Sequence, residues 1–149
     1  MRAVIQRVLR AKVEVEGRVV GEIGKGILAY VSVGKGDTER DAEWVAGKVA
    51  ELRIFGDEAG KMNVGAAEAG AQVLAISNFT LHGDCRKGRR PGFDGAAAPG
   101  EAERLYEMVC KCIQDKGLRV ERGVFGAHMH VESVNDGPVT FIIDSGPAL

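Results

Sequence analysis

Residues 131–143 have the sequence VESVNDGPVTFII, in which two β-rich runs flank Asn135-Asp136-Gly137-Pro138. Asn, Asp and Gly tolerate unusual backbone angles, whereas Pro fixes its own φ, donates no backbone hydrogen bond and readily takes a cis peptide bond. A Gly-Pro pair therefore presents a rigid surface of backbone atoms with little side chain. The simplest interpretation of this motif alone is a tight turn between two strands.

Outside this stretch, strand patterns dominate the chain. Residues 1–8 and 12–16 alternate apolar and polar side chains, as strands with one solvated face do. Residues 27–33 and 71–76 are almost wholly apolar, which is typical of strands covered on both faces. Further strand patterns occupy residues 118–120, 127–134 and 139–143.

Two segments have helical spacing. Thr38 and Asp41 resemble a capping box, and the apolar side chains that follow recur every three or four residues up to Leu52. Pro99 suits the first turn of a second helix, whose apolar stripe ends at Lys116-Gly117. Between them, residues 56–70 and 82–98 are predicted loops. The sequence thus predicts an α/β fold in which sheet outweighs helix.

Size and composition limit the class of protein. The 149 residues suit a single domain, 1–149, and 20 Lys and Arg nearly balance 21 Asp and Glu, so affinity for nucleic acid would need a local basic patch. No apolar run approaches the roughly 20 residues of a membrane span, and three cysteines make a disulfide framework improbable. We expect a cytoplasmic protein without a membrane partner.

A second motif, Ser77-Asn78-Phe79-Thr80-Leu81, follows the apolar strand at 71–76. Polar clusters at strand ends are common positions for functional sites. The structural alternative is that the hydroxyls of Ser77 and Thr80 satisfy backbone groups at the strand end.

Two further groups of side chains are candidates for binding. Residues 86–90 hold four cations, Arg86, Lys87, Arg89 and Arg90, which suit phosphate groups but also occur in solvated loops. His128 and His130 would lie on one face of a strand as a possible metal pair; the simpler interpretation is two histidines without a metal.

Together, Ser77–Leu81 and Asn135–Thr140 resemble the two signature motifs of the D-aminoacyl-tRNA deacylases, the family that removes D-amino acids mistakenly esterified to tRNA. The resemblance covers the whole chain. It is supported by residues 1–8, Lys61-Met62-Asn63, Lys87–Pro91 with Phe93, and Phe125-Gly126-Ala127 with Met129.

The resemblance implies a homodimer whose subunits each form a sheet-rich single domain, with mixed and antiparallel strands in a barrel-like sheet and two main covering helices. It implies chiral proofreading in translation by hydrolysis of the ester at the 3′ end of aminoacyl-tRNA, with no cofactor and no metal. The implied catalytic residues are Ser77, Asn78, Phe79 and Thr80; the implied substrate-binding residues are Ala127, Met129, Asn135, Gly137 and Pro138; and the implied tRNA-phosphate residues are Arg86, Lys87, Arg89 and Arg90.

The resemblance also implies that a cis Gly137-Pro138 peptide reaches into the partner subunit's pocket. L and D aminoacyl groups differ in which side of Cα carries the hydrogen and which carries the side chain. A pocket wall that leaves room for the hydrogen but not for a side-chain carbon would tell them apart, and rigid backbone provides such a wall. Glycine carries hydrogen on both sides, so this filter should also admit glycyl-tRNA.

Two questions have more than one answer from the sequence: which group attacks the ester, and which activity the protein has. The resemblance points to attack by water, with help from the terminal ribose hydroxyl and with backbone N–H groups of Phe79 and Thr80 holding the oxyanion, whereas a covalent Thr80 would need a base that the motif does not offer. Asn78 stands where the family has glutamine, and His82-Gly83 replaces an aromatic-small pair. A non-catalytic nucleic-acid-binding relative, or a deacylase acting on a mischarged L-aminoacyl-tRNA, is the rival interpretation.

Overall fold

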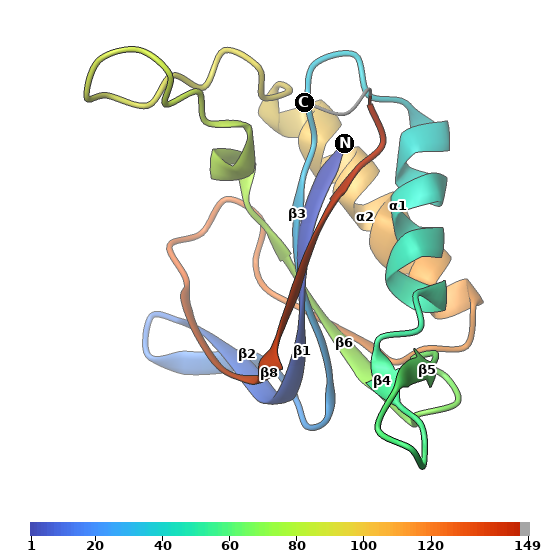
Figure 1. Cartoon of the computed structure of the whole chain (residues 1–149). Helices are drawn as coiled ribbons and strands as arrows, with labels where there is room; N and C mark the ends of the chain where they lie inside the picture. The colour runs from blue at the N-terminus through green and yellow to red at the C-terminus, as the bar shows by residue number, and fades with distance from the viewer. Residues whose placement is uncertain (147–149) are drawn as a thin grey trace.

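Two long strands, β1 (Arg2–Val15) and β8 (His130–Asp144), pair antiparallel along nearly their whole length and organise the fold (Figure 1). This computed structural model describes residues 1–146. The pairing covers both sides of the Asn135–Pro138 motif, because β1 pairs with residues 130–135 on one side and with residues 140–144 on the other. The motif is therefore a bend inside one strand, marked by two register shifts, and the turn expected from it is wrong.

The remaining strands complete a mixed sheet in the order β2-β1-β3-β6-β7. Their bounds are β2 (Arg18–Ile23), β3 (Gly26–Ser32), β6 (Gln72–Ser77) and β7 (Val120–Arg122). The β3–β6 and β6–β7 pairs are parallel, and the pairs made by β1 are antiparallel. Because β2 also contacts β6 and β7, the sheet curls toward a barrel, which confirms the expected sheet-rich fold.

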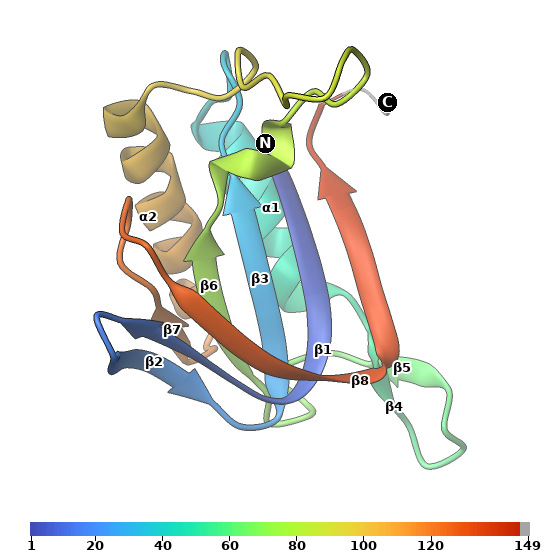
Figure 2. The ribbon, with the colours of Figure 1, turned by 90° about the vertical axis from the view of Figure 1, so that its left-hand side faces the viewer.

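Two helices, α1 (Glu39–Glu51) and α2 (Pro99–Asp115), cover one face of the sheet (Figure 2). The Thr38–Asp41 capping box and Pro99 at the first turn are both present, as the sequence predicts. The main core lies between these helices and the sheet, and a smaller cluster of Val, Ile and Leu side chains fills the curl of the sheet. Within residues 1–146, every helix is too short or too polar to span a bilayer.

Four boundaries differ from the sequence prediction. The strand expected at residues 118–120 lies two residues further along the chain, as β7. The segments at 1–8 and 12–16 belong to one strand, because β1 keeps pairing with β8 between them. Residues 56–70 are not only loop: β4 (Phe55–Gly56) and β5 (Met62–Val64) pair where the Asp57 carboxylate accepts backbone N–H groups of Ala59 and Lys61 and closes a turn. Ala127 to Met129 precede β8 instead of starting it.

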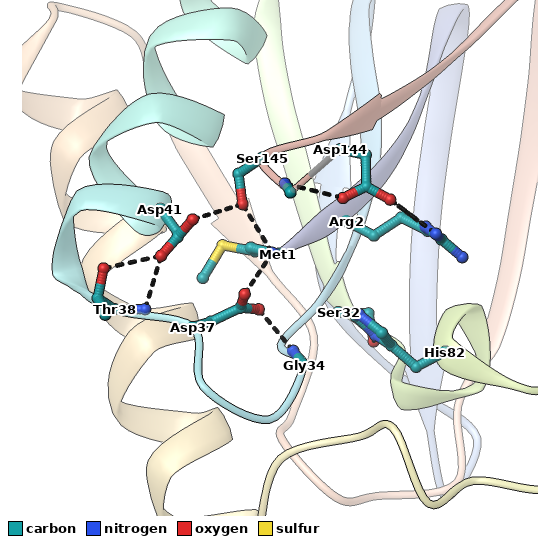
Figure 3. A network of polar contacts seen from close by, with 11 residues as sticks. Met1, Arg2, Ser32, Gly34, Asp37, Thr38, Asp41, His82, Asp144 and Ser145 are labelled. Carbon is teal, nitrogen blue, oxygen red and sulfur yellow. Dashed lines mark hydrogen bonds and ion pairs between the residues drawn. The ribbon is translucent and has the colours of Figure 1, made fainter. Parts of the chain in front are cut away.

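A polar network holds the end of β8 that lies beyond the bend (Figure 3). The Met1 ammonium donates to Asp37 Oδ1 at 2.6 Å and to Ser145 Oγ at 2.7 Å, and the Ser145 hydroxyl donates to Asp41 Oδ1 at 2.7 Å. Nearby, Arg2 binds Asp144 with a shortest distance of 2.7 Å. The hydrogen bond from the Ser145 hydroxyl, followed by those from the Thr38 hydroxyl and the Thr38 N–H, lowers the pKa of Asp41 to about 2.

Candidate functional site

A cavity of about 630 Å³ opens where the parallel strands β3 and β6 end. Its walls come from these strand ends, the short 3-10 helix η1 (Phe79–His82), the start of α2 and the loop before β8. Most of the wall is apolar, and its polar side chains belong to Tyr30, Ser32, Ser77, Asn78, Thr80 and His128. Among the described residues no Asp, Glu, Lys or Arg side chain lines it, so a ligand must be recognised by the remaining polar groups and by shape.

The Ser77–Thr80 segment forms the middle of this cavity wall. Ser77 is the last residue of β6, opposite Val31 of β3, and the Asn78 N–H donates to the Val31 carbonyl at 2.8 Å. Here the chain leaves the sheet and turns into η1. The turn leaves Phe79 56% exposed, with its ring edge-on to Phe93 at 5.1 Å between centroids.

The Asn78 side chain folds back on the start of η1. Its Oδ1 accepts hydrogen bonds from the Thr80 hydroxyl at 2.5 Å and, at a longer 3.3 Å, from the Thr80 backbone N–H. The amide therefore caps η1 in the way that asparagine caps helices generally. A carboxamide is not a base at neutral pH, so this contact does not activate the Thr80 hydroxyl as a nucleophile.

The loop before β8 forms the other side of the cavity. Ala127, His128 and Met129 all line it. The rings of His128 and His130 lie edge to face with centroids 5.2 Å apart. Within residues 1–146 no third His, Cys, Asp or Glu joins them in a group that could hold a metal ion.

The Asn135–Pro138 bend lies outside this cavity. Asn135 Nδ2 donates to the carbonyls of Arg7 at 2.9 Å and Val139 at 3.0 Å, which holds the two sides of the bend together. The Arg7 guanidinium donates to the carbonyls of Asp136 and Ile54. The Gly137–Pro138 peptide bond is cis, as the resemblance implies, and both residues are exposed.

The four cations of the basic loop have different surroundings. Arg86 donates to both carboxylate oxygens of Asp84, and this contact lowers the pKa of Asp84 to about 2. Lys87, Arg89 and Arg90 are exposed. Arg86, Lys87 and Arg90 also line a cleft of about 380 Å³, together with the carboxylates of Asp84 and Asp94, so the cleft carries both signs of charge.

Ser32 is a cavity residue that is not among the site residues expected from the sequence. Ser32 ends β3, lines the cavity and lies 2.6 Å from Nδ1 of His82, the last residue of η1. A Cβ added to Gly34 would lie 2.8 Å from His82 Nε2, so the ring fits against a bare backbone position. The available signals were weak: one hydroxyl at the end of an apolar strand, and a histidine noted only as a departure from a family pattern.

Comparison with known proteins gives concordant matches. The family model described as D-Tyr-tRNA(Tyr) deacylase matches residues 4–144. A protein of Thermotoga petrophila named D-aminoacyl-tRNA deacylase is 56% identical over 145 residues, which cover 97% of each chain. One of the same name from Geobacter sulfurreducens is 57% identical over 145 residues, covering 97% of this chain and 95% of the relative.

Solved structures show the same architecture. The structure of a protein named c-Myc DNA Unwinding Element Binding Protein superposes with a TM-score of 0.91 at 35% identity, covering 98% of this chain and 99% of the other. A probable eukaryotic D-amino acid tRNA deacylase superposes with a TM-score of 0.82 at 17% identity, over 95% and 97% of the two chains, and this likeness supports the fold alone.

Proposed function

The chain belongs to the D-Tyr-tRNA(Tyr) deacylase family, and from that premise we propose that it hydrolyses the ester bond of D-aminoacyl-tRNA and releases the D-amino acid and free tRNA. The observation that carries the proposal is the Ser77–Thr80 motif, which lines a cavity of about 630 Å³. The enzyme would act in the cytoplasm as a proofreading hydrolase of translation.

Ester hydrolysis requires an attacking group and stabilisation of the developing oxyanion. Water is the nucleophile in this proposal, because the partner of the Thr80 hydroxyl is the Asn78 amide and not a base. The backbone N–H groups of Phe79 and Thr80 would hold the oxyanion at the start of η1. The 3.3 Å contact from Thr80 N–H to Asn78 is long enough for an oxyanion to replace it.

Rejection of L-aminoacyl groups would come from Gly137 and Pro138 of a second subunit. The pair is exposed and does not line the cavity of its own chain, so a wall made from it requires another copy. Association is supported by β8, which pairs only with β1 among the described strands and exposes Phe141 by 38% and Ile142 by 75%. Asn135 would hold the wall in shape, and Ala127 and Met129 would face the aminoacyl group.

The basic loop would contact phosphates near the 3′ end of the tRNA. Lys87, Arg89 and Arg90 are exposed and available for phosphate, whereas Arg86 is already paired with Asp84. The cleft beside these side chains lies next to η1 through His82, so tRNA bound there can extend its terminus toward the cavity.

Deacylation of D-tyrosyl-, L-tyrosyl- and glycyl-tRNA by the purified protein tests the function. We expect rapid release from the D-tyrosyl and glycyl substrates and little from the L-tyrosyl substrate. Release from none of them would instead support a nucleic-acid-binding role, which the name of one structural neighbour ascribes to that protein. Substantial L-tyrosyl release would indicate a deacylase for mischarged L-aminoacyl-tRNA, and an aminoacyl ester trapped on Thr80 would refute attack by water.

A further inference from the structure

The short helix η1 carries the N–H groups that would hold the oxyanion, and the hydrophobic core does not fix its position. It is four residues long, Phe79–His82, and none of these residues is buried. A single turn of 3-10 helix has little stability of its own, because few backbone hydrogen bonds offset the cost of ordering it. The position of η1 over the cavity therefore depends on polar contacts at its two ends.

The two ends of η1 are held differently. At the start, the Asn78 N–H donates to the Val31 carbonyl of β3 at 2.8 Å, so the sheet fixes this end. At the other end, the N–H that could bond to the Leu81 carbonyl in a continuing 3-10 helix belongs to Asp84. That N–H donates to the Gly92 carbonyl at 2.7 Å instead. The Leu81 carbonyl therefore needs a donor from outside the helix.

Arg2, the first residue of β1, supplies this donor. Its Nη1 donates to the Leu81 carbonyl at 3.1 Å, while Nε and Nη2 both donate to Asp144 Oδ2, at 2.9 and 2.7 Å (Figure 3). A planar guanidinium has donors on more than one edge, so it can hold both acceptors at once. The side chains of Arg2 and Asp144 are only 19% and 25% exposed, and solvent therefore screens this ion pair less than one on the surface.

The carboxylate that anchors Arg2 is itself part of the sheet. Asp144 is the last residue of β8 and lies opposite Arg2 in the register of the β1–β8 pair. Its Oδ1 accepts the Gly146 N–H at 3.1 Å, and the next residue, Ser145, donates its N–H to the Met1 carbonyl at 2.9 Å. The guanidinium is thus held on a fixed support and presents Nη1 to η1 from there.

Building on the proposed function, we propose that Arg2 is a positioning residue for the hydrolysis. It holds η1 through the Leu81 carbonyl, so that the N–H groups of Phe79 and Thr80 face the developing oxyanion. Arg2 does not line the cavity, so its effect on the reaction passes through η1. Donors aimed at an oxyanion act in the transition state, and a displacement of about 1 Å can cost roughly a hundredfold in rate. The contact between His82 and Ser32 remains without Arg2, so the expected loss is about tenfold.

Two non-hydrolysable analogues of the acylated 3′-adenosine separate the transition state from the ground state. One carries D-tyrosine through a 3′-amide, and the other replaces the carbonyl group by a phosphonate whose charged oxygen mimics the oxyanion. Each is titrated against the full-length protein by calorimetry. We expect Arg2→Met to weaken binding of the phosphonate about tenfold and binding of the amide less than twofold. In deacylation of D-tyrosyl-tRNA, kcat should fall by a similar factor while KM changes little.

Two further variants separate the bridge from its charge. Lys12→Met is the matched control: Lys12 also lies on β1 and pairs with carboxylates, Glu14 and Glu132, so the variant removes a paired cation without touching η1. It should bind both analogues as the unmodified protein does. Arg2→Lys keeps the charge and the pair with Asp144 but loses the second edge of donors, so it should still bind the phosphonate about tenfold more weakly. Full phosphonate affinity in Arg2→Lys would refute the bridge to Leu81.

The same titrations keep the inference distinct from the proposed function. If the unmodified protein clears D-tyrosyl-tRNA, but Arg2→Met weakens both analogues equally or neither, only the role of Arg2 is wrong. If the unmodified protein neither clears D-tyrosyl-tRNA nor binds either analogue, both proposals are wrong. Thermal unfolding shows whether each variant is folded at the assay temperature. If Arg2→Met is not, the comparison of Arg2→Lys with the unmodified protein decides.

Discussion

The two motifs that identify the family have opposite surroundings in one subunit. Ser77–Thr80 lies at the end of β6 and forms the wall of the cavity, with its polar groups engaged by its own chain. Asn135–Pro138 is a bend in β8 that faces solvent and lines no part of that cavity. Ser77–Thr80 thus contacts a cavity of its own subunit, whereas Asn135–Pro138 is held in a defined conformation but contacts no cavity of its own subunit. This difference favours a site shared between two copies.

Complementation between two inactive variants has the largest expected effect. Ala127→Trp fills the cavity, and Gly137→Ala places a Cβ 2.7 Å from Val139 Cγ2 at a φ of 135°, so each variant alone should lose at least about a hundredfold in kcat/KM. Co-expressed, half of the dimers are mixed and one of their two sites is unaltered, so about a quarter of the activity should return.

The control for this experiment is each variant co-expressed with itself. Absence of recovery in mixed dimers whose composition is verified by differently tagged subunits would mean that both motifs act within one subunit. The exposure of Asn135–Pro138 in one subunit would then need another explanation.

Loosening the bend without removing it should have an intermediate effect. Asn135→Ala leaves the carbonyls of Arg7 and Val139 without the Nδ2 donor, at a cost of about 1–2 kcal/mol. We expect kcat/KM for D-tyrosyl-tRNA to fall about tenfold and the ratio of D to L hydrolysis to fall with it. Asn63→Ala, which removes a side chain in the β5 strand, controls for a general loss of stability. An unchanged D to L ratio would show that the bend does not select the enantiomer.

The basic loop should contribute a smaller, salt-dependent effect. Replacing Arg89 and Arg90 by alanine removes two exposed cations, so the dependence of log affinity for tRNA on log salt should become less steep by about one to two. Arg86→Ala is the matched comparison, because Arg86 is already neutralised by Asp84, and it should change the slope less. Equal slopes in all three proteins would refute phosphate contact at this loop.

The polar network beyond the bend should give the smallest effect. The folded-state pKa of Asp41 is about 2, below its ordinary value near 4, so its ionised form stabilises the fold at neutral pH and this contribution is lost as the pH falls from about 4 toward 2. After screening by solvent we expect about 1 kcal/mol or less. Thermal unfolding of Asp41→Asn should lack this part of the pH dependence, while its activity at neutral pH stays near normal.

The spacing of apolar residues and the helix-start signals predicted most of the helices and strands, because these patterns depend only on residues close together in the sequence. The capping box at Thr38, Pro99 at the start of α2 and the apolar strands at 27–33 and 71–76 all occur as expected. The sequence did not predict that β8 continues through the bend, because Asn-Asp-Gly-Pro is ordinarily a turn signal. The strand continues because β1 pairs with it on both sides of the motif. That partner, β1, comes from the opposite end of the sequence.

The candidate site was predictable only in part. The resemblance identified Ser77–Thr80 and Asn135–Pro138, and the structure shows which of them lines the cavity of its own chain. The contact between Ser32 and His82 spans 50 residues and depends on where η1 folds over β3, which no local pattern encodes. The pairing of Arg86 with Asp84 likewise separates one cation from three others that look equivalent in the sequence.

Because Gly34 and His82 approach closely, the side chain that fits at one of these positions depends on the residue at the other. With only 2.8 Å between a would-be Cβ and Nε2, any larger residue at 34 displaces the imidazole, and a smaller side chain at 82 leaves a gap beside the strand. A substitution at position 34 should therefore shift the imidazole at position 82, and the effects of changes at the two positions should not add. Libraries that vary both together can exchange the imidazole for bulk at position 34.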